Sequence, residues 1–459
     1  MQRLRESCAD DRITNLPADV MHRILVFLPI KDAAKTSVLS MQWRHRWRGI
    51  PELVFDREFA SIFGKVKSER EEMSRRAMTN IYRCLLLNDG AAVTKFVLAI
   101  HGFIPCNHEI DLLPLYLSNK GVQHFTLNFD SADECLYDED CVDLYKYQMH
   151  SSLFSALHLK SLQLQALVFT PPPCFVGFSK LTFLEFGYVR LPLDFFDSFL
   201  PKCPILESLR LRCCWGHAVE VRIKAPFLKS FHFWGFELVA ISFADTPLLS
   251  DLLLHFHHCR VPDIASLFAS LPALRHFFAN GAVLKDLAAG DGKNVPTRLP
   301  TPHHQLQDLY LKSHAFEGPG MERVLVCLIM SSPNLRRLRI EVSPRDDQRS
   351  NDEVSSSLWR LLEAAGDSPG SSACLQHLRK FRIKHSLCTQ VELDLVRFVL
   401  ATAPLLRLVH VNPGFAMAAE KIMKFMSEVM QYTRVSKEAK VIFDNDTRDD
   451  PFTYAESQL

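Results

Sequence analysis

The sequence of 459 residues has no long hydrophobic run and almost no net charge. Its longest clear apolar run, Val324–Met330, has seven residues, whereas a membrane-spanning helix needs about 20. The first residues, MQRLRESCADDR, contain no apolar core of the kind that a secretory signal requires. Lys and Arg total 53 against 52 for Asp and Glu, so no global field draws the chain to nucleic acid or to an anionic membrane. We therefore expect neither a membrane nor a nucleic acid as a partner.

The thirteen cysteines form no pattern of disulfide or zinc-binding pairs. Their number is odd, no C-x-x-C occurs, and most of them lie in apolar segments, as Cys84, Cys203 and Cys327 do. Without a secretory signal, this favours reduced cysteines that pack as small hydrophobic residues. The sequence therefore predicts a reducing compartment, cytoplasm or nucleus, and a protein that is not secreted.

Motifs of catalysis and cofactor binding are absent as well. The sequence contains neither G-x-S-x-G nor H-E-x-x-H, and GDGK at 290–293 lacks the preceding strand and following helix of a phosphate-binding loop. Zinc sites usually show two separated pairs with regular spacing, which favours ordinary polar positions for the two histidine groups. These groups are His255, His257, His258 and Cys259, and His303 with His304. We expect no catalytic residue, no metal and no cofactor, and hence a protein that is not an enzyme.

What the sequence does contain begins with a helical pattern in residues 10–50. Apolar residues recur every four positions from Val20 to Leu28, Pro17 suits the first turn of a helix, and Pro29 ends it. Three short helices are expected, over residues 17–28, 31–39 and 41–47. About forty residues bury too little apolar surface to be stable alone, so we expect the segment to dock on its own chain or on another protein.

The same segment resembles the F-box as it occurs in plant proteins. The matching run is Leu16-Pro17, Ile24-Leu25, Leu28-Pro29, Thr36–Ser40 and Trp43–Trp47, with Met41-Gln42 where the family usually has a basic pair. The resemblance implies a helical hook that binds the Skp-type adaptor of a cullin-based ubiquitin ligase. The residues that would line or support this contact are Leu16, Pro17, Ile24, Leu25, Leu28, Pro29, Val38, Leu39, Trp43 and Trp47. The alternative for some of them, above all Trp47, is packing inside the chain.

Residues 43–48, WRHRWR, are basic with interleaved aromatic residues, as in some nucleic-acid-binding surfaces. The stretch is short and its neighbours are mixed in sign, so we interpret its charges as the solvated face of the third helix.

The rest of the chain repeats the template Leu-x-x-Leu-x-Leu, with Phe, Val or Ile allowed at the Leu positions. Twelve copies begin at Val93, Val122, Leu159, Leu181, Leu206, Leu228, Leu249, Leu274, Leu306, Leu335, Leu378 and Leu406. From Leu159 to Leu274 the steps are 22, 25, 22, 21 and 25 residues, within the range of leucine-rich repeats. A proline often precedes the template, as Pro204 and Pro226 do.

In each copy the last two template residues alternate along a short strand and point to one face, which a stack of repeats shares as a continuous core. Unrelated strands in an ordinary sheet are the alternative. The pattern resembles the degenerate leucine-rich repeats that follow the F-box in many plant proteins. The predicted fold is α/β, a three-helix F-box followed by an irregular leucine-rich-repeat solenoid. We expect surface loops at 130–143, 286–304 and 343–372, the last with a short helix around Val354–Ala365.

The C-terminal part predicts two helices, Val391–Ala401 and Ala416–Tyr432, followed by a last strand, Lys440–Phe443. This arrangement is similar to the FBD module that ends many plant F-box and repeat proteins, and such a module would cap the array. The predicted domains are an F-box at 10–50, a helical linker at 51–90, a repeat array at 91–373 and an FBD-like module at 374–445.

The non-core side of the predicted strands would form the concave face of the stack and bind a target protein. Its cations and large aromatic side chains suit binding hot spots, and arginine forks suit an acidic or phosphorylated segment. The candidate target-binding residues are Arg210, Arg212, His232, Trp234, Phe278, Tyr310, Lys312, Arg337 and Arg339. Solvated strand ends are the alternative interpretation.

The function that the resemblance implies is the substrate-recognition subunit of an SCF-type (Skp–cullin–F-box) ubiquitin ligase. Its partners would be the Skp-type adaptor, through it a cullin, and a target whose identity the sequence does not give. Two alternatives stay open, a repeat-based binding scaffold outside any ligase and an enzyme that uses the repeat face as an active site.

Overall fold

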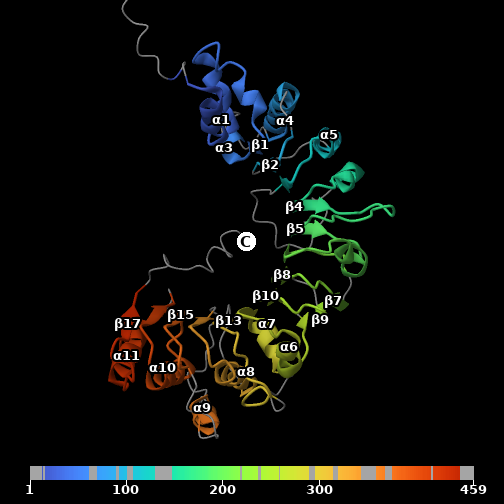
Figure 1. Cartoon of the computed structure of the whole chain (residues 1–459). Helices are drawn as coiled ribbons and strands as arrows, with labels where there is room; N and C mark the ends of the chain where they lie inside the picture. Colours follow the sequence, from blue (N-terminus) through green and yellow to red (C-terminus); the bar gives the residue numbers. More distant parts are fainter. Residues whose placement is uncertain are drawn as a thin grey trace, which may run out of the picture. The chain divides into compact units, whose positions relative to one another are not determined.

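The structure of the chain is a computed structural model (Figure 1). It describes residues 13, 16–60, 70–88, 92–100, 107–129, 147–217, 220–235, 239–257, 259–288, 295–313, 319–342, 358–366, 375–414 and 417–444. The chain divides into two compact units, Met1–Leu206 with Cys214–His217, and Glu207–Cys213 with Ala218–Leu459. Within the described residues, no helix is both long and apolar enough to cross a membrane.

The first unit contains a parallel sheet in which neighbouring strands follow one another in the sequence. Each strand pairs with the next, so that Leu53, Phe96 and Phe125 stand side by side in register. The rings of Phe96 and Phe125 stack with their centroids 5.9 Å apart, which adds a specific aromatic contact to the burial of apolar area. The strands are β1 (Glu52–Phe55), β2 (Lys95–Ala99), β3 (His124–Asn128), β4 (Ser161–Val168) and β5 (Phe183–Arg190).

The second unit repeats this arrangement over nine parallel strands in its described residues. They are β6 (Ser208–Arg212), β8 (Ser230–Gly235), β10 (Asp251–Phe256), β12 (His276–Asn280), β13 (Asp308–Ser313), β14 (Arg337–Val342), β15 (Lys380–Ser386), β16 (Leu408–Pro413) and β17 (Lys440–Phe443). A small second sheet, which the sequence pattern did not reveal, pairs β7 (Glu220–Ile223), β9 (Val239–Phe243) and β11 (Cys259–Arg260) in parallel.

All twelve copies of the repeat template coincide with parallel strands, and none lies in the small sheet of β7, β9 and β11. The first residue of each copy, from Val93 to Leu406, is buried, and so are the two template residues inside each strand. The copy of β12 has Ala279 in the last place, and this small residue is buried too. This confirms the predicted core positions. The structure adds a thirteenth copy, Ile50-x-x-Leu53-x-Phe55, whose three apolar side chains are also buried. The expected helical linker at 51–90 therefore begins with β1.

The prolines before the strands occupy the second position of tight turns. In the turn before β6, the amide of Leu206 donates a hydrogen bond to the carbonyl of Cys203, with Pro204 between them. The same bond joins Leu228 to Ala225 around Pro226. Proline suits this position because its fixed φ matches the turn. The proline thus shapes the turn that leads into each strand as well as ending the preceding connection.

Helices cover one side of the strands in the second unit (Figure 1). They are α6 (Ile264–Ser270), α7 (Gly281–Leu287), α8 (Pro319–Met330), α9 (Leu358–Gly366), α10 (Gln390–Thr402) and α11 (Ala419–Gln431). The longest apolar run of the sequence, Val324–Met330, is the buried second half of α8, which lies against α7 and α9. A helix that is apolar all round is expected where neighbours enclose it.

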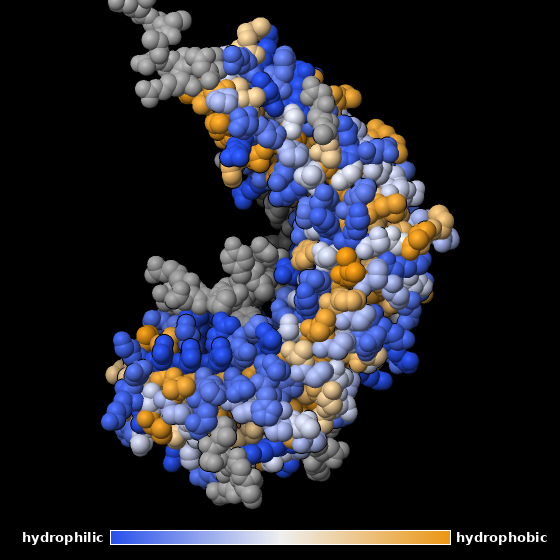
Figure 2. All heavy atoms as spheres, viewed as in Figure 1, coloured by the Kyte–Doolittle hydropathy of each residue, from blue (hydrophilic) through white to orange (hydrophobic). Residues whose placement is uncertain are grey.

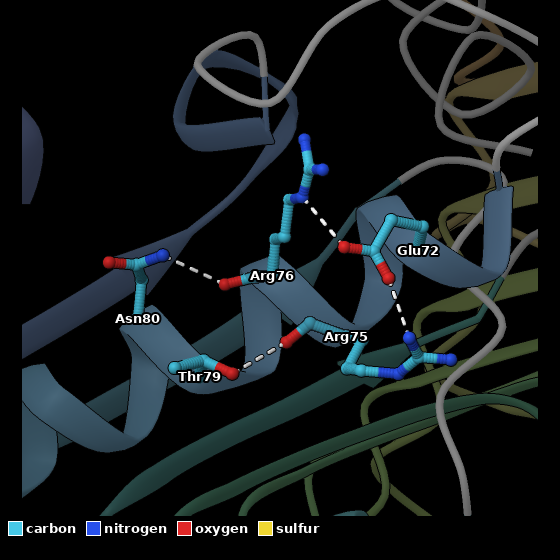
Figure 3. Close-up of polar contacts among 5 residues, drawn as sticks. All are labelled: Glu72, Arg75, Arg76, Thr79 and Asn80. Carbon is cyan, nitrogen blue, oxygen red and sulfur yellow. Dashed lines mark hydrogen bonds and ion pairs between the residues drawn. The ribbon is translucent and has the colours of Figure 1, made fainter.

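In the first unit, helix α4 (Arg70–Leu87) supplies the helical part of the expected linker. Its buried face includes Ala77, Ile81 and Leu85. Its outer face carries ion pairs from Glu72 to Arg75 and to Arg76, and hydrogen bonds from the side chains of Thr79 and Asn80 to backbone carbonyls one turn earlier (Figure 3). The other helical segments of this unit are α3 (Arg57–Ala60), α5 (Asn107–Ser118), η7 (Ser151–Ser155), η8 (Phe195–Phe199) and η9 (Leu200–Lys202).

The N-terminal segment contains two of the three expected α-helices. Helix α1 spans Ala18–Val26, and α2 (Ile30–Lys35) continues into a 3₁₀ turn, η1 (Thr36–Val38). The third expected helix, over 41–47, is wrong, because the chain there forms consecutive tight turns and the 3₁₀ helix η2 (Arg46–Gly49). Every backbone bond joins residues three apart, as from Arg46 to Trp43, which is the pattern of 3₁₀ rather than α geometry.

The C-terminal elements have the predicted order of strand, helix, strand, helix and strand. Helix α10 lies within one residue of its expected bounds and α11 within three, and β17 spans the expected Lys440–Phe443. Of the expected surface loops, 130–143 lies outside the described residues, as do most of 343–372 and residues 289–294 of 286–304. The helix expected around Val354–Ala365 is α9.

Candidate functional site

Large apolar side chains are exposed on the N-terminal segment. Phe27 and Val38 are each 87% exposed and Met41 is 80% exposed, and Leu39 and Ile24 are exposed too. We call these five residues the apolar F-box surface. Ile24 lies on α1, Phe27 directly follows it, and the other three come from η1 and the turn after it, within 18 residues of sequence from Ile24 to Met41. So many exposed large apolar residues over a short distance are typical of a protein-binding surface.

The interior of this segment holds other residues that we expected at the contact. Leu25, Trp43 and Trp47 are buried, and the indole N–H of Trp43 donates a 3.1 Å hydrogen bond to the carbonyl of Ile13. These three residues therefore support the surface from inside and do not form it. Of the remaining predicted contacts, Val38, Leu39, Ile24, Pro17 and Pro29 are exposed, whereas Leu16 and Leu28 are half-buried.

Phe27 and Met41 belong to the apolar F-box surface but were not among the predicted contacts. A signal for Phe27 exists in the sequence, because α1 has more apolar residues than one buried face can use. Met21 and Leu25 fill that face, one turn apart, and leave Ile24 and Phe27 outside.

In the second unit, the candidate target-binding residues lie on the side of the strands opposite the repeat core. We call this side the outer strand face. Register aligns one residue of each strand in a row across it, which runs Arg210, His232, Leu253, Phe278, Tyr310, Arg339, Arg382 and His410. Neighbouring members of such a row are about 4.8 Å apart, so their side chains touch.

Aromatic contacts join the middle of the outer strand face. The rings of Trp234 and His255 stack at 4.1 Å between centroids, and Phe278 meets Tyr310 edge-on at 4.6 Å. The guanidinium of Arg339 lies 4.7 Å from the centre of the Tyr310 ring, within the range of a cation–π interaction. Leu253, Phe278 and Tyr310 form a buried cluster. Mutual packing therefore removes much of this apolar surface from solvent.

Charges at the same face are arranged around Glu341. Its carboxylate accepts hydrogen bonds from the Tyr310 hydroxyl and from Lys312 at 2.9 Å, and Lys384 lies at 4.0 Å. Burial alone would raise the pKa of Glu341, but Lys312, the Tyr310 hydroxyl and Lys384 together hold it below its ordinary value. Glu341 is therefore ionised at neutral pH and forms an ion pair with Lys312.

A second set of charges lies at the first residues of β12, β13 and β14. The ring of His276 lies 3.0 Å from the carboxylate of Asp308, which Arg337 also contacts through two nitrogen atoms. Burial alone would raise the pKa of Asp308, but the hydrogen bonds of His276 and Arg337 hold it below its ordinary value. The Asp308 hydrogen bond raises the pKa of His276 above 6.5 despite partial burial.

This raised pKa makes the contribution of His276 to stability depend on pH. Protonated His276 is favoured in the folded state, so its contribution is complete below pH 6.5 and is lost as pH rises through the higher folded pKa. We expect His276→Gln to weaken the second unit more at pH 6 than at pH 8.5. Hydrogen exchange of β12 and β13 at both pH values measures this, and an equal effect at the two values would contradict it.

The structure changes the interpretation of several candidate target-binding residues. Phe278, Tyr310 and Arg339 are buried, and Arg337 is held by Asp308. These residues build the outer strand face and do not offer free contacts. Arg210, Arg212, His232, Trp234 and Lys312 remain partly exposed. Direct recognition by this set of residues stays a prediction, and the two arginines of β14 are the least available members.

Histidine and cysteine side chains are the remaining candidates for a site. Among the described residues, no group of three or more His, Cys, Asp or Glu side chains could hold a metal ion. His258 lies outside the described residues. Cys84 and Cys203 form no disulfide, and burial raises the pKa of Cys84 to about 11 and that of Cys203 to about 12. At neutral pH these two are protonated small hydrophobic residues, as expected.

Comparisons with known proteins give matches to the N-terminal segment and to the repeats. Residues 13–54 match the F-box domain, and residues 114–340 match the family described as FBD-associated F-box protein At5g56370, LRR repeats. The chain is 28% identical over 442 residues to F-box/FBD/LRR-repeat protein At1g13570 of Arabidopsis thaliana, covering 94% of this chain and 98% of that protein.

Two further relatives from Arabidopsis thaliana match a smaller part. F-box/LRR-repeat protein 25 is 27% identical over 56% of this chain and 87% of its own length. Putative F-box/FBD/LRR-repeat protein At4g03220 is 31% identical over 48% of this chain and 42% of its own length. F-box domains generally bind Skp-type adaptors. The chain therefore contains an F-box domain followed by leucine-rich repeats, and it is similar over most of its length to an F-box/FBD/LRR-repeat protein of Arabidopsis thaliana.

Proposed function

We propose that the chain is the substrate-recognition subunit of an SCF-type ubiquitin ligase. Its N-terminal segment docks the Skp-type adaptor, and through it a cullin, while the repeats bind a target protein. The observation that carries this proposal is the apolar F-box surface. Phe27, Val38 and Met41 leave most of their area in solvent, above an interior that Leu25, Trp43 and Trp47 already fill.

Burial of these side chains in an interface supplies the affinity. Each large apolar side chain contributes about 1.5–3 kcal/mol when it is removed from water, so Val38 and Leu39 together contribute about 3 kcal/mol or more. A carboxylate at either position would have to lose its hydration without a partner, which costs further free energy. The absence of catalytic motifs suits a subunit that positions a target while other subunits form the bond.

The test is the capture of a purified Skp-type adaptor by the full-length chain. We expect Val38→Asp with Leu39→Asp to weaken binding at least about a hundredfold, since 1.4 kcal/mol is a factor of ten. The fold should not change, because Val38 is almost fully exposed and Leu39 is more than half exposed.

The chain supplies a closely matched control for this experiment. Val176 is 88% exposed and Leu157 is 57% exposed, against 87% for Val38 and 52% for Leu39. Val176→Asp with Leu157→Asp adds the same two charges at similar exposure outside the N-terminal segment, and should leave adaptor binding unchanged. Equal binding by the two double variants would show that the apolar F-box surface is not the docking site.

Ligase function requires a second measurement. A reconstituted complex with cullin and ubiquitin enzymes should modify a protein that co-purifies with the chain, and the Val38→Asp, Leu39→Asp variant should not support this. Adaptor binding without any modification of captured proteins would favour the binding scaffold outside a ligase.

A further inference from the structure

Exposed positive charges follow one another across the last four strands of the second unit. Arg336, Arg379 and Arg407 stand one residue before β14, β15 and β16, and Lys380 and Lys440 begin β15 and β17. All five side chains are exposed. We call these residues the cationic strip.

Backbone pairing fixes the spacing of the cationic strip. The amide of Arg379 donates to the carbonyl of Arg336 at 2.9 Å, that of Arg407 to Arg379 at 2.9 Å, and that of Lys440 to Arg407 at 3.0 Å. Each residue is therefore one strand spacing from the next, about 4.8 Å, and the strip extends about 15 Å across the sheet. The positions are held by the parallel sheet and not by a loop.

Some of the corresponding positions in earlier repeats carry paired charges, although Arg275, one residue before β12, is an exposed cation like those of the strip. There, Lys229 forms a 2.8 Å ion pair with Glu207, and Asp308 is held by Arg337 and His276. None of the five strip side chains forms an ion pair or hydrogen bond with any residue that the structure describes. Figure 2 shows hydrophilic residues gathered over the part of the second unit that carries β13, β15 and β17.

We propose that the cationic strip binds an acidic polypeptide segment, whose Asp and Glu carboxylates pair with Arg336, Arg379, Arg407 and the two lysines. Arginine presents a planar fork that matches a carboxylate with two parallel hydrogen bonds. An extended peptide advances about 3.3 Å per residue, so about five residues span the strip. The inference rests on the proposed function only in taking this segment to belong to the target protein.

The dimensions of the strip favour a peptide over a nucleic acid. Single-stranded nucleic acids are held by basic grooves with aromatic side chains on which the bases stack. The strip is short, its five members include no aromatic residue, and the net charge of the chain is +1. Four strand starts in a row match a few carboxylates of one short segment.

The test uses the full-length chain and a fluorescein-labelled peptide of ten glutamates, with a peptide of ten glutamines and a ten-nucleotide single-stranded RNA as competing probes. Fluorescence anisotropy at increasing salt measures binding. We expect the glutamate peptide to bind, the glutamine peptide not to bind, and salt to weaken the interaction. Arg379→Glu with Arg407→Glu should weaken it at least about tenfold, since attraction becomes repulsion at two adjacent positions.

A variant with the same change in net charge serves as the control. Arg360 on α9 and Lys424 on α11 are exposed cations of the same unit outside the strip. Arg360→Glu with Lys424→Glu should change binding by less than about twofold, because neither cation belongs to the strip and salt screens interactions between separated exposed charges. Arg379→Lys with Arg407→Lys should retain most binding.

Three results would overturn the proposal. In the first, the two charge-reversed variants lose binding of the glutamate peptide equally. In the second, the glutamate peptide does not bind at low salt. In the third, the RNA binds more tightly than the peptide, and Arg379→Glu with Arg407→Glu weakens binding of the RNA. The assay contains no adaptor, so its outcome is independent of the F-box test. Adaptor capture by Arg379→Glu, Arg407→Glu should equal that of the wild type.

Discussion

Replacement of Phe169 by alanine is expected to destabilise the first unit by about 3–5 kcal/mol. Phe169 directly follows β4, is fully buried, and lies 4.8 Å from Phe186, 5.1 Å from Phe199 and 5.3 Å from Phe154 between ring centroids. Removal of the ring leaves a cavity that these rigid neighbours fill only in part. It also removes edge-on and tilted ring contacts, which contribute beyond the burial of area.

The measurement should report on each unit separately, because a chain of this size need not unfold in one step. Hydrogen exchange of β4 and β5 under increasing urea follows the first unit. Phe227→Ala is the control, since Phe227 is 52% exposed and its removal should cost less than about 1 kcal/mol. If hydrogen exchange of β4 and β5 is equally fast in Phe169→Ala and Phe227→Ala, the phenylalanine cluster around Phe169 is not the core of the unit.

The sequence predicts the repeat core well because the template is a local property. Burial of Leu209 and Leu211, for example, follows from two-residue alternation along one strand, whatever the strand pairs with. The copy at Ile50-x-x-Leu53-x-Phe55 was missed although it fits the same template, and its step of 43 residues to Val93 equals the step from Leu335 to Leu378. The small sheet of β7, β9 and β11 was missed because its short strands carry no template.

The candidate sites were harder to predict because they depend on pairing between distant residues. Alternation places Arg337 outside the core, but only the register of β13 and β14 shows that Asp308 already holds it. The cationic strip is also defined by register, because its charges have no carboxylate partner among the described residues once the strands are paired. In the N-terminal segment, the spacing of Trp43 and Trp47 suggested an α-helix, whereas tight turns bring both rings inside. The local pattern placed both rings on one face, but it gave neither the burial of Trp43 nor the backbone geometry.

Replacement of Trp43 by alanine is expected to unfold the N-terminal segment locally, with a loss of about 3–5 kcal/mol. Trp43 is among the largest fully buried side chains, and its indole also donates the hydrogen bond to Ile13. The segment consists of short helices and turns with little other core, so the loss of one large ring is a large fraction of its stability. Adaptor binding should therefore disappear together with the fold of residues 16–50.

Trp43→Ala and the surface variant Val38→Asp with Leu39→Asp should give different results. The difference tests whether Trp43 belongs to the interior and whether Val38 and Leu39 belong to the docking surface. Trp43→Ala should increase hydrogen exchange across α1 and η2 and abolish adaptor capture, whereas Val38→Asp with Leu39→Asp should abolish capture with exchange unchanged. Trp43→Phe, which keeps a ring and loses the hydrogen bond to Ile13, should cost only about 1–2 kcal/mol and retain capture. Normal exchange in Trp43→Ala would mean that Trp43 does not support this segment. Faster exchange in the surface variant would mean that Val38 and Leu39 hold the fold together, and the docking surface would then have to lie elsewhere.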